Sequence, residues 1–319
     1  MRSRTCFLII ICLVVATIFL IFFEDQRPIG TIQSLVTETN KQFYKIKNFK
    51  DNLELSEQKK LITDDKYLKI LGFVDNPRLY PHSVWRNSSL PIRLMKFCNS
   101  SKCFVIDLNY DLFPSHVAKL SIHAYRPVII QDALNFAGAV LYMECNVRVS
   151  FGNISALVNK SLKTGIVLSE QEDVGVSNQK HAVTSLTHPK MFEYFQTVVD
   201  NFEFTPMISV RSMLVYNTEA VHKNIMLPWV QCALIQECIY PIGAQSDGCR
   251  FDKKPHFRYS GCHRYDESAL NLVLGLYFGV DNVSLYSWDN SRTRLFYNVT
   301  DELAEKEYFL LKSNLTGTS

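Results

Sequence analysis

Residues 125–149 read YRPVIIQDALNFAGAVLYMECNVRV, and this stretch decides the fold class. Its first half lies in a region, Ser115–Phe136, where apolar residues recur at helical spacing, and Pro127 predicts either two helices or one kinked helix. Its second half, Ala139–Val149, is almost continuously apolar, which is typical of a strand in a sheet covered on both faces. A helix followed directly by such a strand indicates an α/β fold.

Strands and helices continue to alternate on both sides of this stretch. The further predicted strands are Cys103–Asn109, Gly165–Leu168, Met207–Tyr216 and Val283–Trp288, and the further predicted helices are Met191–Phe202, Ala220–Ile239 and a strongly amphipathic His263–Phe278. This order predicts an α/β body with a mostly parallel sheet flanked by helices.

The amino terminus has the pattern of a membrane anchor. Residues 6–23 are eighteen uncharged residues, preceded by Arg2 and Arg4 and followed by two acidic residues. The positive-inside rule then predicts a type II signal-anchor with a cytosolic tail at 1–5, a polar luminal stem at 24–65 and a luminal domain at 66–319. A cleavable signal peptide is the alternative, but no small-x-small cleavage pattern follows the apolar run. The short span favours the endoplasmic reticulum or Golgi membrane.

Composition excludes several classes of protein. Charged residues make up 20% and hydrophobic residues 47% of the chain, so a disordered chain is excluded. A net charge of +3 without a dense Lys/Arg stripe argues against nucleic acid as a partner. A single long apolar segment excludes a polytopic transporter.

Glycosylation sequons and cysteines agree with a luminal domain. Seven Asn-x-Ser/Thr sequons begin at Asn87, Asn99, Asn153, Asn159, Asn282, Asn298 and Asn314. Seven cysteines follow the anchor, and their proximity predicts the disulfides Cys98–Cys103, Cys232–Cys238 and Cys249–Cys262, with Cys145 left over. A zinc site is the alternative, but the chain has no Cys-x-x-Cys pair.

The first candidate site is the tripeptide Glu144-Cys145-Asn146, at the end of a predicted strand. Ligands of open α/β sheets gather beyond the carboxyl ends of strands. Glu144 and Asn146 are two positions apart and are expected to point to the same side, where their oxygens suit Mn²⁺ or Mg²⁺. Such a cation would neutralise a diphosphate leaving group. The alternative is an ordinary polar strand end.

The second candidate site opens the helix at 263–278. Asp266 or Glu267 is predicted to act as a general base, and His263 to contact a metal or a phosphate. The alternative is structural, because acidic residues in a first helical turn are favoured by the helix dipole and by capping.

Two arginines complete the candidate cofactor-binding set. Arg126 next to a helix start is predicted to meet a phosphate, and Arg148 follows the acidic tripeptide. The alternative for Arg126 is a solvated arginine. A thiol hydrolase with Cys145 as nucleophile and His263 as base is a further alternative, but nothing in the sequence places these two residues together. The remaining histidines have no metal-ligand spacing.

Four ordered segments together resemble a known family. They are Phe113–Val149, Met191–Phe195 (MFEYF), Leu214–Gly243 and Cys262–Leu274 (CHRYDESALNLVL). They resemble a nematode-expanded family of uncharacterised type II membrane proteins, classed with the nucleotide-diphospho-sugar transferases of the GT-A type. The resemblance covers roughly Cys98 to Phe278.

The resemblance implies a GT-A-like, Rossmann-like fold and a site for a metal and a nucleotide-sugar diphosphate. Glu144 and Asn146 stand where the family usually has Asp and Ser, and both replacements change the oxygen ligands. Asp266 stands where a GT-A enzyme often has an acceptor-activating carboxylate, and Glu267 replaces a Gln of the family pattern. The chain is expected to lack part of the strand–helix–strand unit for the nucleotide base that such folds place before the region of Cys98.

The function expected from these features is that of a luminal glycosyltransferase-like glycoprotein of the Golgi or endoplasmic reticulum. It would transfer a sugar from a nucleotide-sugar donor to a glycan or protein acceptor. The alternative is a catalytically inactive luminal binding or scaffold protein that keeps the fold. A surface adhesion domain, favoured by glycosylation and disulfides alone, is the third hypothesis.

Overall fold

A computed structural model describes residues 62–74, 85–86, 106–150, 154–170, 181–252, 254–289 and 295–316. These residues belong to one compact unit, Lys60–Ser319. The predicted cytosolic tail and anchor, nearly all of the predicted stem, and the region around Cys98 lie outside the described residues. Among the described residues, no helix has the length and apolar character needed to cross a membrane.

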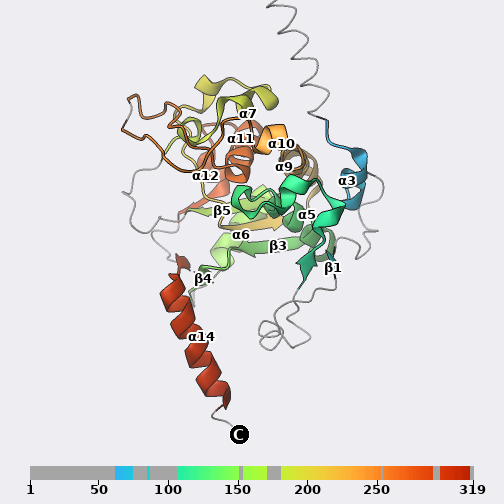
Figure 1. The fold of residues 1–319 in the computed structure, drawn as a ribbon, viewed down its shortest axis with the longest axis vertical. Helices are drawn as coiled ribbons and strands as arrows, with labels where there is room; N and C mark the ends of the chain where they lie inside the picture. The colour runs from blue at the N-terminus through green and yellow to red at the C-terminus, as the bar shows by residue number, and fades with distance from the viewer. Residues whose placement is uncertain are drawn as a thin grey trace, which may run out of the picture. The chain divides into compact units, whose positions relative to one another are not determined.

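A four-stranded sheet organises this unit (Figure 1). The strand order is β3-β6-β5-β7, with β3 at Ala139–Met143, β6 at Ser212–Tyr216, β5 at Ile166–Glu170 and β7 at Ser287–Asp289. β6 runs antiparallel to both β3 and β5, whereas β5 and β7 are parallel. The α/β class is therefore confirmed, and the sheet is mixed.

The prediction of a mostly parallel sheet was wrong. The alternation of strands and helices predicts parallel pairing, but it does not fix strand direction, and continuous apolar strands require only that both faces of the sheet are covered. Alternate residues of β6 show this cover, because Met213 and Val215 join one hydrophobic cluster and Leu214 joins another. The burial pattern thus identifies a sheet between two apolar layers without giving strand direction.

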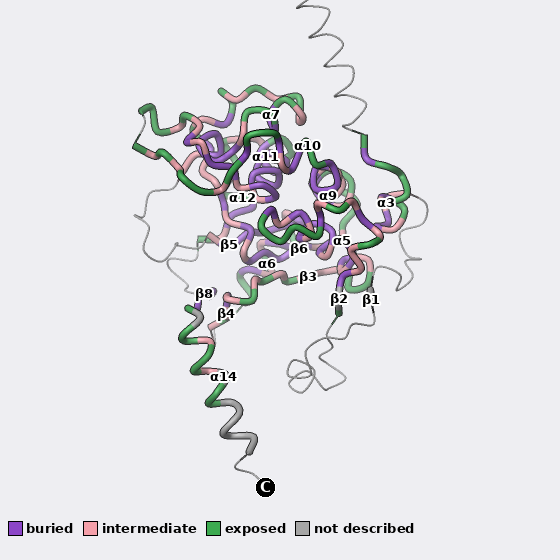
Figure 2. The backbone as a smooth tube through the Cα atoms, viewed as in Figure 1, coloured by how far each residue is buried: buried purple, intermediate pink, exposed green. Residues whose placement is uncertain are grey.

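The two layers come from different parts of the chain. On one face, α5 (Tyr125–Ala137) packs against β3 and against α9 (Leu227–Leu234), which in turn packs on α11 (Asp266–Phe278). Leu157 of α6 (Ser155–Thr164) belongs to the other cluster, and α6 contacts β5 and β6. Figure 2 shows α9 and α11 as mostly buried.

The predicted strand Ala139–Val149 is two strands with a turn between them. β3 ends at Met143, and β4 (Val147–Val149) begins after a turn closed by the Val147 N–H donating to the Glu144 carbonyl at 2.9 Å. β4 pairs with β8 (Phe296–Asn298) in a separate two-stranded sheet. The tripeptide from Glu144 therefore occupies a turn at the carboxyl end of β3.

Helix α11 differs from its prediction in two ways. It begins at Asp266 instead of His263, because Tyr265 has a positive φ of 49° that a right-handed helix does not allow. The prediction of a strongly amphipathic helix was wrong, since all residues from Ser268 to Gly275 are buried. The cause is its central place, with contacts to α9, to α12 (Val283–Tyr286) and to other helical segments.

The structure also shows how the chain is arranged around Pro127, where the sequence predicts two helices or one kinked helix. Short 3-10 turns occupy Ser115–Ala118 and Leu120–Ile122, and Pro127 lies in the first turn of α5, where a missing N–H is tolerated.

The predicted last strand, Val283–Trp288, is in fact α12 followed by β7.

The remaining elements are α3 (Asp65–Ile70), β1 (Trp85–Arg86), β2 (Asp107–Leu108), a 3-10 turn at Tyr110–Leu112, another at Val183–Leu186, α7 (Pro189–Tyr194), a 3-10 turn at Val199–Phe202, α8 (Glu219–Val221), a π-helical turn at His222–Met226, α10 (Gln236–Ile239) and α14 (Asp301–Thr316).

Two of the three predicted disulfides are present. Cys232 and Cys238 are joined with an S–S distance of 2.02 Å, and Cys249 and Cys262 with 2.05 Å. Cys145 is free, as predicted, and it is exposed. The predicted pair Cys98–Cys103 lies outside the described residues.

Candidate functional site

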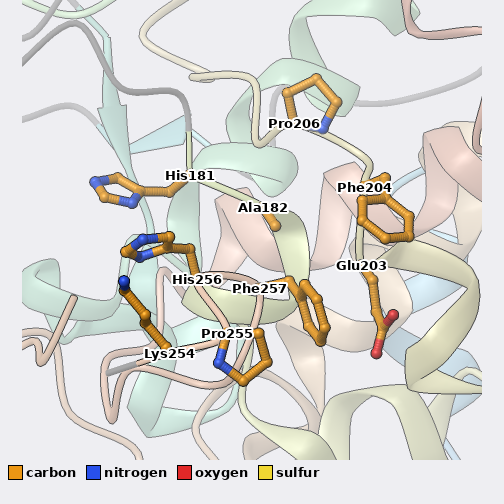
Figure 3. Close-up of a pocket in the computed structure, with 9 residues that line it drawn as sticks. All are labelled: His181, Ala182, Glu203, Phe204, Pro206, Lys254, Pro255, His256 and Phe257. Carbon is orange, nitrogen blue, oxygen red and sulfur yellow. The ribbon is translucent and has the colours of Figure 1, made fainter. Parts of the chain in front are cut away.

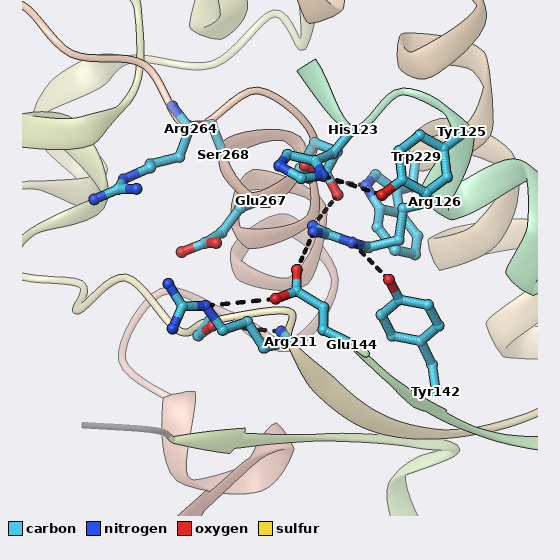
Figure 4. Close-up of polar contacts among 12 residues, drawn as sticks. His123, Tyr125, Arg126, Tyr142, Glu144, Arg211, Trp229, Arg264, Glu267 and Ser268 are labelled. Carbon is cyan, nitrogen blue, oxygen red and sulfur yellow. Dashed lines mark hydrogen bonds and ion pairs between the residues drawn. The ribbon is translucent and has the colours of Figure 1, made fainter. Parts of the chain in front are cut away.

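A buried arginine joins three parts of the chain that are distant in sequence. Arg126, in the first turn of α5, has a side chain that is 3% exposed. Its Nη1 lies 2.5 Å from Asp266 Oδ2 at the start of α11, and its Nη2 lies 2.5 Å from Glu144 Oε1 at the end of β3. The sequence-based alternative of a solvated arginine is therefore wrong. Three predicted site residues therefore meet in one place, and Figure 4 shows Arg126 and Glu144 within this group.

Two further residues complete this group. The Nε–H of Arg126 donates to the Tyr142 hydroxyl at 3.2 Å, and Arg211 Nε lies 3.7 Å from Glu144 Oε2. The backbone N–H of Glu144 also donates to the Arg211 carbonyl at 2.9 Å, which ties β3 to the residue before β6. We call Arg126, Tyr142, Glu144, Arg211 and Asp266 the Arg126 cluster.

The backbone around Asp266 is held in an unusual conformation. The Trp229 indole N–H donates to the Asp266 backbone carbonyl at 2.9 Å, which fixes the start of α11 against α9. The residue before it, Tyr265, has φ of 49°, and His123, three residues before Arg126, has φ of 52°. In the described chain only Gln196 is a further non-glycine residue with positive φ. Such backbone strain is concentrated at functional sites in proteins, so its position here favours a functional role.

Burial and charge act in opposite directions on these groups. Burial raises the pKa of Asp266 above its ordinary value, and the Arg126 guanidinium opposes that rise. Burial lowers the pKa of Arg126, but the charge of Asp266, with Tyr142 and Glu144, outweighs it, so the arginine stays charged. Burial raises the pKa of the Tyr142 phenol to about 12, so this hydroxyl stays neutral. The cluster is thus a fixed cation between two carboxylates.

A histidine that the sequence analysis did not select lies beside the cluster. His123 Nδ1 is 3.3 Å from the Tyr125 hydroxyl, and both rings are partly exposed. Burial, followed by the charge of Arg126, lowers the pKa of His123, which favours a neutral imidazole. A neutral imidazole next to charged groups can accept or donate a proton.

The open side of the cluster carries more charge. In Figure 4 the side chains of Arg264, Glu267 and Arg211 extend toward the same side, beyond the buried part around Arg126. Glu267 is partly exposed, whereas the side chain of Asp266 is 1% exposed. Of the two predicted general bases, only Glu267 therefore has a side chain that a bound molecule can reach in this conformation.

Two predicted cofactor-binding residues have structural contacts outside the cluster. Arg148 Nη1 donates to the Cys145 carbonyl at 2.8 Å, and its Nε lies 3.4 Å from Glu307 Oε2, so it braces the turn after β3 and contacts α14. His263 is fully buried, and its Nδ1 accepts from the His188 N–H at 3.1 Å. Its Nε2 lies 3.2 Å from the Ile239 carbonyl.

His263 is therefore a buried link between two loops. Burial, followed by the charge of His188, lowers its pKa to about 3, so it is neutral at physiological pH. Both of its ring nitrogens have backbone partners, and Cys145 is exposed elsewhere. Neither finding supports the thiol-hydrolase alternative.

The predicted metal ligands do not form a cation site in this conformation. Both carboxylate oxygens of Glu144 face arginines, and the Oδ1 of Asn146 is buried without a hydrogen-bond partner among the described residues. The expectation that residues two apart share a side applies to an extended strand, whereas residues 144–146 form a turn. Within the described ranges, no group of three or more His, Cys, Asp or Glu side chains could hold a metal ion.

Sequence reasoning missed Tyr142 and Arg211. Tyr142 had a usable signal, because it is two positions before Glu144 within the predicted strand Ala139–Val149, where alternate residues are expected to share a face. Arg211 had none, since its contact with Glu144 depends on the antiparallel pairing of β3 with β6.

The chain was compared with protein-family models, curated proteins and solved structures, and no match was found in any of the three.

Proposed function

We propose that this protein is a luminal glycosyltransferase-like enzyme that moves a sugar from a nucleotide-sugar donor to a glycan or protein acceptor. The observation that carries the proposal is the meeting of Arg126, Glu144 and Asp266 at the carboxyl end of β3. Arg126 and Glu144 belong to one segment of the GT-A-like resemblance, Phe113–Val149, and Asp266 belongs to another, Cys262–Leu274. The ends of strands in α/β sheets are where such folds gather their ligands.

We assign a role to each residue from the exposure of its side chain. Asp266 and Arg126 are buried and hold the site in place, and Arg126 orients Glu144 through the 2.5 Å contact. Glu267, partly exposed on the open side, is the group that can accept the proton of an acceptor hydroxyl. The hydroxyl oxygen then bonds to the anomeric carbon of the donor sugar, and the bond from that carbon to the diphosphate breaks.

Arginines, in this proposal, neutralise the diphosphate. Arg211 and Arg264 lie on the open side of the cluster, and guanidinium groups bind phosphate oxygens strongly. Mn²⁺ or Mg²⁺ at Glu144 and Asn146 stays a prediction, and the present donor set does not fit it. We therefore derive no step through a metal ion.

The compartment is part of the same proposal. Two disulfides among the described residues are typical of a protein that folds in an oxidising lumen. The single anchor at 6–23, the type II orientation and the Golgi or endoplasmic reticulum membrane remain predictions from the sequence.

A catalytically inactive binding or scaffold protein is the second candidate. It is favoured by the burial of Asp266, whose side chain is 1% exposed and paired with Arg126. A buried ion pair of this kind can have a purely structural role. Turnover therefore distinguishes the two candidates.

The test uses the full-length protein purified in detergent. It is incubated with UDP-, GDP- and CMP-sugars and a mixture of glycan acceptors, with and without EDTA, and transfer is followed by mass spectrometry. We expect transfer from one donor class and at least about a hundredfold loss of kcat in Glu267→Gln, which is the usual weight of a general base. The comparison with and without EDTA tests the predicted metal ion.

The matched control is Glu193→Gln, an exposed acidic residue on α7 outside the cluster, which should keep wild-type activity. Full activity of Glu267→Gln would remove its assigned role. Absence of transfer, together with absence of a thermal shift by any nucleotide, would favour the inactive binding protein, because a bound ligand must raise stability.

A further inference from the structure

A cavity of about 840 Å³ lies outside the Arg126 cluster. It is formed by residues 181–182, 203–206 and 254–257, and none of the cluster residues lines it (Figure 3). Its volume is within the range of about 300–1,000 Å³ that is usual for small-molecule sites. A second cavity of about 220 Å³ shares Glu203 and Phe257 with it.

The walls of the cavity are held by main-chain hydrogen bonds. The Val183 N–H donates to the Thr205 carbonyl at 2.8 Å, and the Met207 N–H donates to the His181 carbonyl at 2.8 Å, so two of the segments form a short antiparallel pair. The Thr184 hydroxyl donates to the Phe257 carbonyl at 2.5 Å and ties the third segment to them. The lining side chains therefore project from a defined frame.

Basic and apolar side chains are separated across the cavity. In Figure 3, His181, His256 and Lys254 lie on one side, whereas Phe204 and Glu203 lie on the other. The His181 ring is supported by stacking on Phe251, with ring centroids 3.8 Å apart. The basic side offers donors and positive charge to a small anion.

The apolar side offers a surface for a ring. Phe204 is 84% exposed, which is unusual for a phenylalanine, and it lies edge to face with Phe257 at 5.7 Å. Pro206 and Pro255 extend this surface. An exposed aromatic face beside polar groups is suited to a molecule with one apolar face and several hydroxyls.

We propose that this cavity binds an acidic sugar, a pyranose ring that carries one carboxylate. The ring would lie on Phe204 and Phe257, and its carboxylate would pair with Lys254 and the two histidines. Glu203 favours an acidic sugar over a phosphate compound as the ligand. Its carboxylate accepts hydrogen bonds from sugar hydroxyls but repels a multiply charged phosphate. This binding does not depend on sugar transfer at the Arg126 cluster.

The test titrates the full-length protein in detergent with four probes by ligand-observed NMR: glucuronic acid, glucose, UMP and inorganic phosphate. Glucose is the matched neutral sugar, since it differs from glucuronic acid only in a hydroxymethyl group in place of the carboxylate. We expect glucuronic acid to bind up to about fivefold more tightly than glucose, because an exposed ion pair contributes up to about 1 kcal/mol.

Two variants assign the binding to this cavity. Lys254→Gln should remove the preference for glucuronic acid, and Phe204→Ala should weaken the binding of both sugars. Lys163→Gln on α6 and Phe136→Ala on α5, both exposed and outside the cavity, should leave binding unchanged. All four side chains are exposed, so an unchanged melting temperature is expected for each variant.

Three results would overturn the proposal. They are equal binding of glucose and glucuronic acid, tighter binding of UMP or phosphate than of glucuronic acid, and binding that Lys254→Gln and Phe204→Ala leave unchanged. The assay contains no donor or acceptor pair for transfer, so its outcome is independent of the proposed enzymatic activity.

Discussion

Replacement of Arg126 with methionine removes the cation between two carboxylates. Asp266 would then stay in a site where its side chain is 1% exposed, without the guanidinium that lies 2.5 Å away in the wild type. A carboxylate in such a place takes up a proton instead of remaining charged. The free energy needed to protonate Asp266 therefore sets an upper limit to the loss of folding stability that the substitution causes.

This limit depends on pH. About three pH units separate pH 7 from the ordinary aspartate pKa of about 3.9, and each unit is worth about 1.36 kcal/mol, so protonation costs about 4 kcal/mol at pH 7. At pH 5 the same step costs about 1.5 kcal/mol. The lost hydrogen bond to Tyr142 adds about 1 kcal/mol at both values. We expect Arg126→Met to lose at most about 5 kcal/mol at pH 7 and about 2.5 kcal/mol at pH 5.

The raised pKa of Asp266 decides in which direction the stability changes with pH. Because burial raises its pKa in the folded state, the folded protein binds this proton more tightly than the unfolded chain does. Acidification through that range therefore favours the folded state, and removal of Arg126 strengthens the effect by raising the pKa further. The variant should recover stability relative to the wild type as the pH falls from 7 to 5.

Urea unfolding at pH 5 and pH 7, followed by tryptophan fluorescence, measures this difference. Trp229 is fully buried and bonded to the Asp266 carbonyl, so it reports on the cluster. Arg211→Met is the control, since its side chain is 31% exposed and 3.7 Å from Glu144, and it should cost less than about 1 kcal/mol.

Two results would refute this reasoning. One is a loss of less than about 1 kcal/mol for Arg126→Met at pH 7, well below the range of about 3–5 kcal/mol found for broken buried pairs. The other is a larger loss at pH 5 than at pH 7. If the variant does not fold at pH 7, the double variant Arg126→Met with Asp266→Asn keeps the test open, because asparagine carries no charge to bury and should restore folding.

Three further predictions concern stability and covalent state. Gly275→Ala should destabilise the fold by about 1–3 kcal/mol, because the added Cβ would overlap the buried ring of Phe202 in the core, and urea unfolding of the variant would measure the loss. Among the described cysteines, Cys145 alone should react with a maleimide before reduction, and peptide mapping that finds label on any other described cysteine would contradict the two disulfides. Asn159 and Asn282 are exposed sequons and should carry glycans when the protein is expressed in insect cells, so Asn→Gln variants that do not shift on a gel would argue against a luminal domain.

Much of the secondary structure was predictable from local pattern. The strand near Gly165–Leu168, the helix that contains Pro127, and the two local disulfides were confirmed because each depends on residues close in sequence. The disulfides were the simplest case, since Cys232 and Cys238 are only 6 residues apart. Proximity of this kind needs no knowledge of the fold.

Errors arose where the outcome depends on packing. Residues 283–286 form the helix α12 instead of a strand, because a short apolar run fits a buried helix turn as well as a strand. The turn after Met143, which interrupts the predicted strand, is set by the pairing of β4 with β8, about 150 residues later in the chain. Local periodicity contains no information on such partners.

For the candidate site, too, some features could be predicted from the sequence and others depend on packing. The sequence by itself determined the α/β class, the positions of Arg126, Glu144 and Asp266 at the ends of helices and strands, and the free Cys145. Only the tertiary structure decided that the first three residues meet, that Arg126 occupies both carboxylates, and that His263 is a buried link instead of a ligand. The physical reason is that residue type and local spacing specify an element and its ends, whereas contacts across 18 and 140 residues depend on how the sheet and its helices pack.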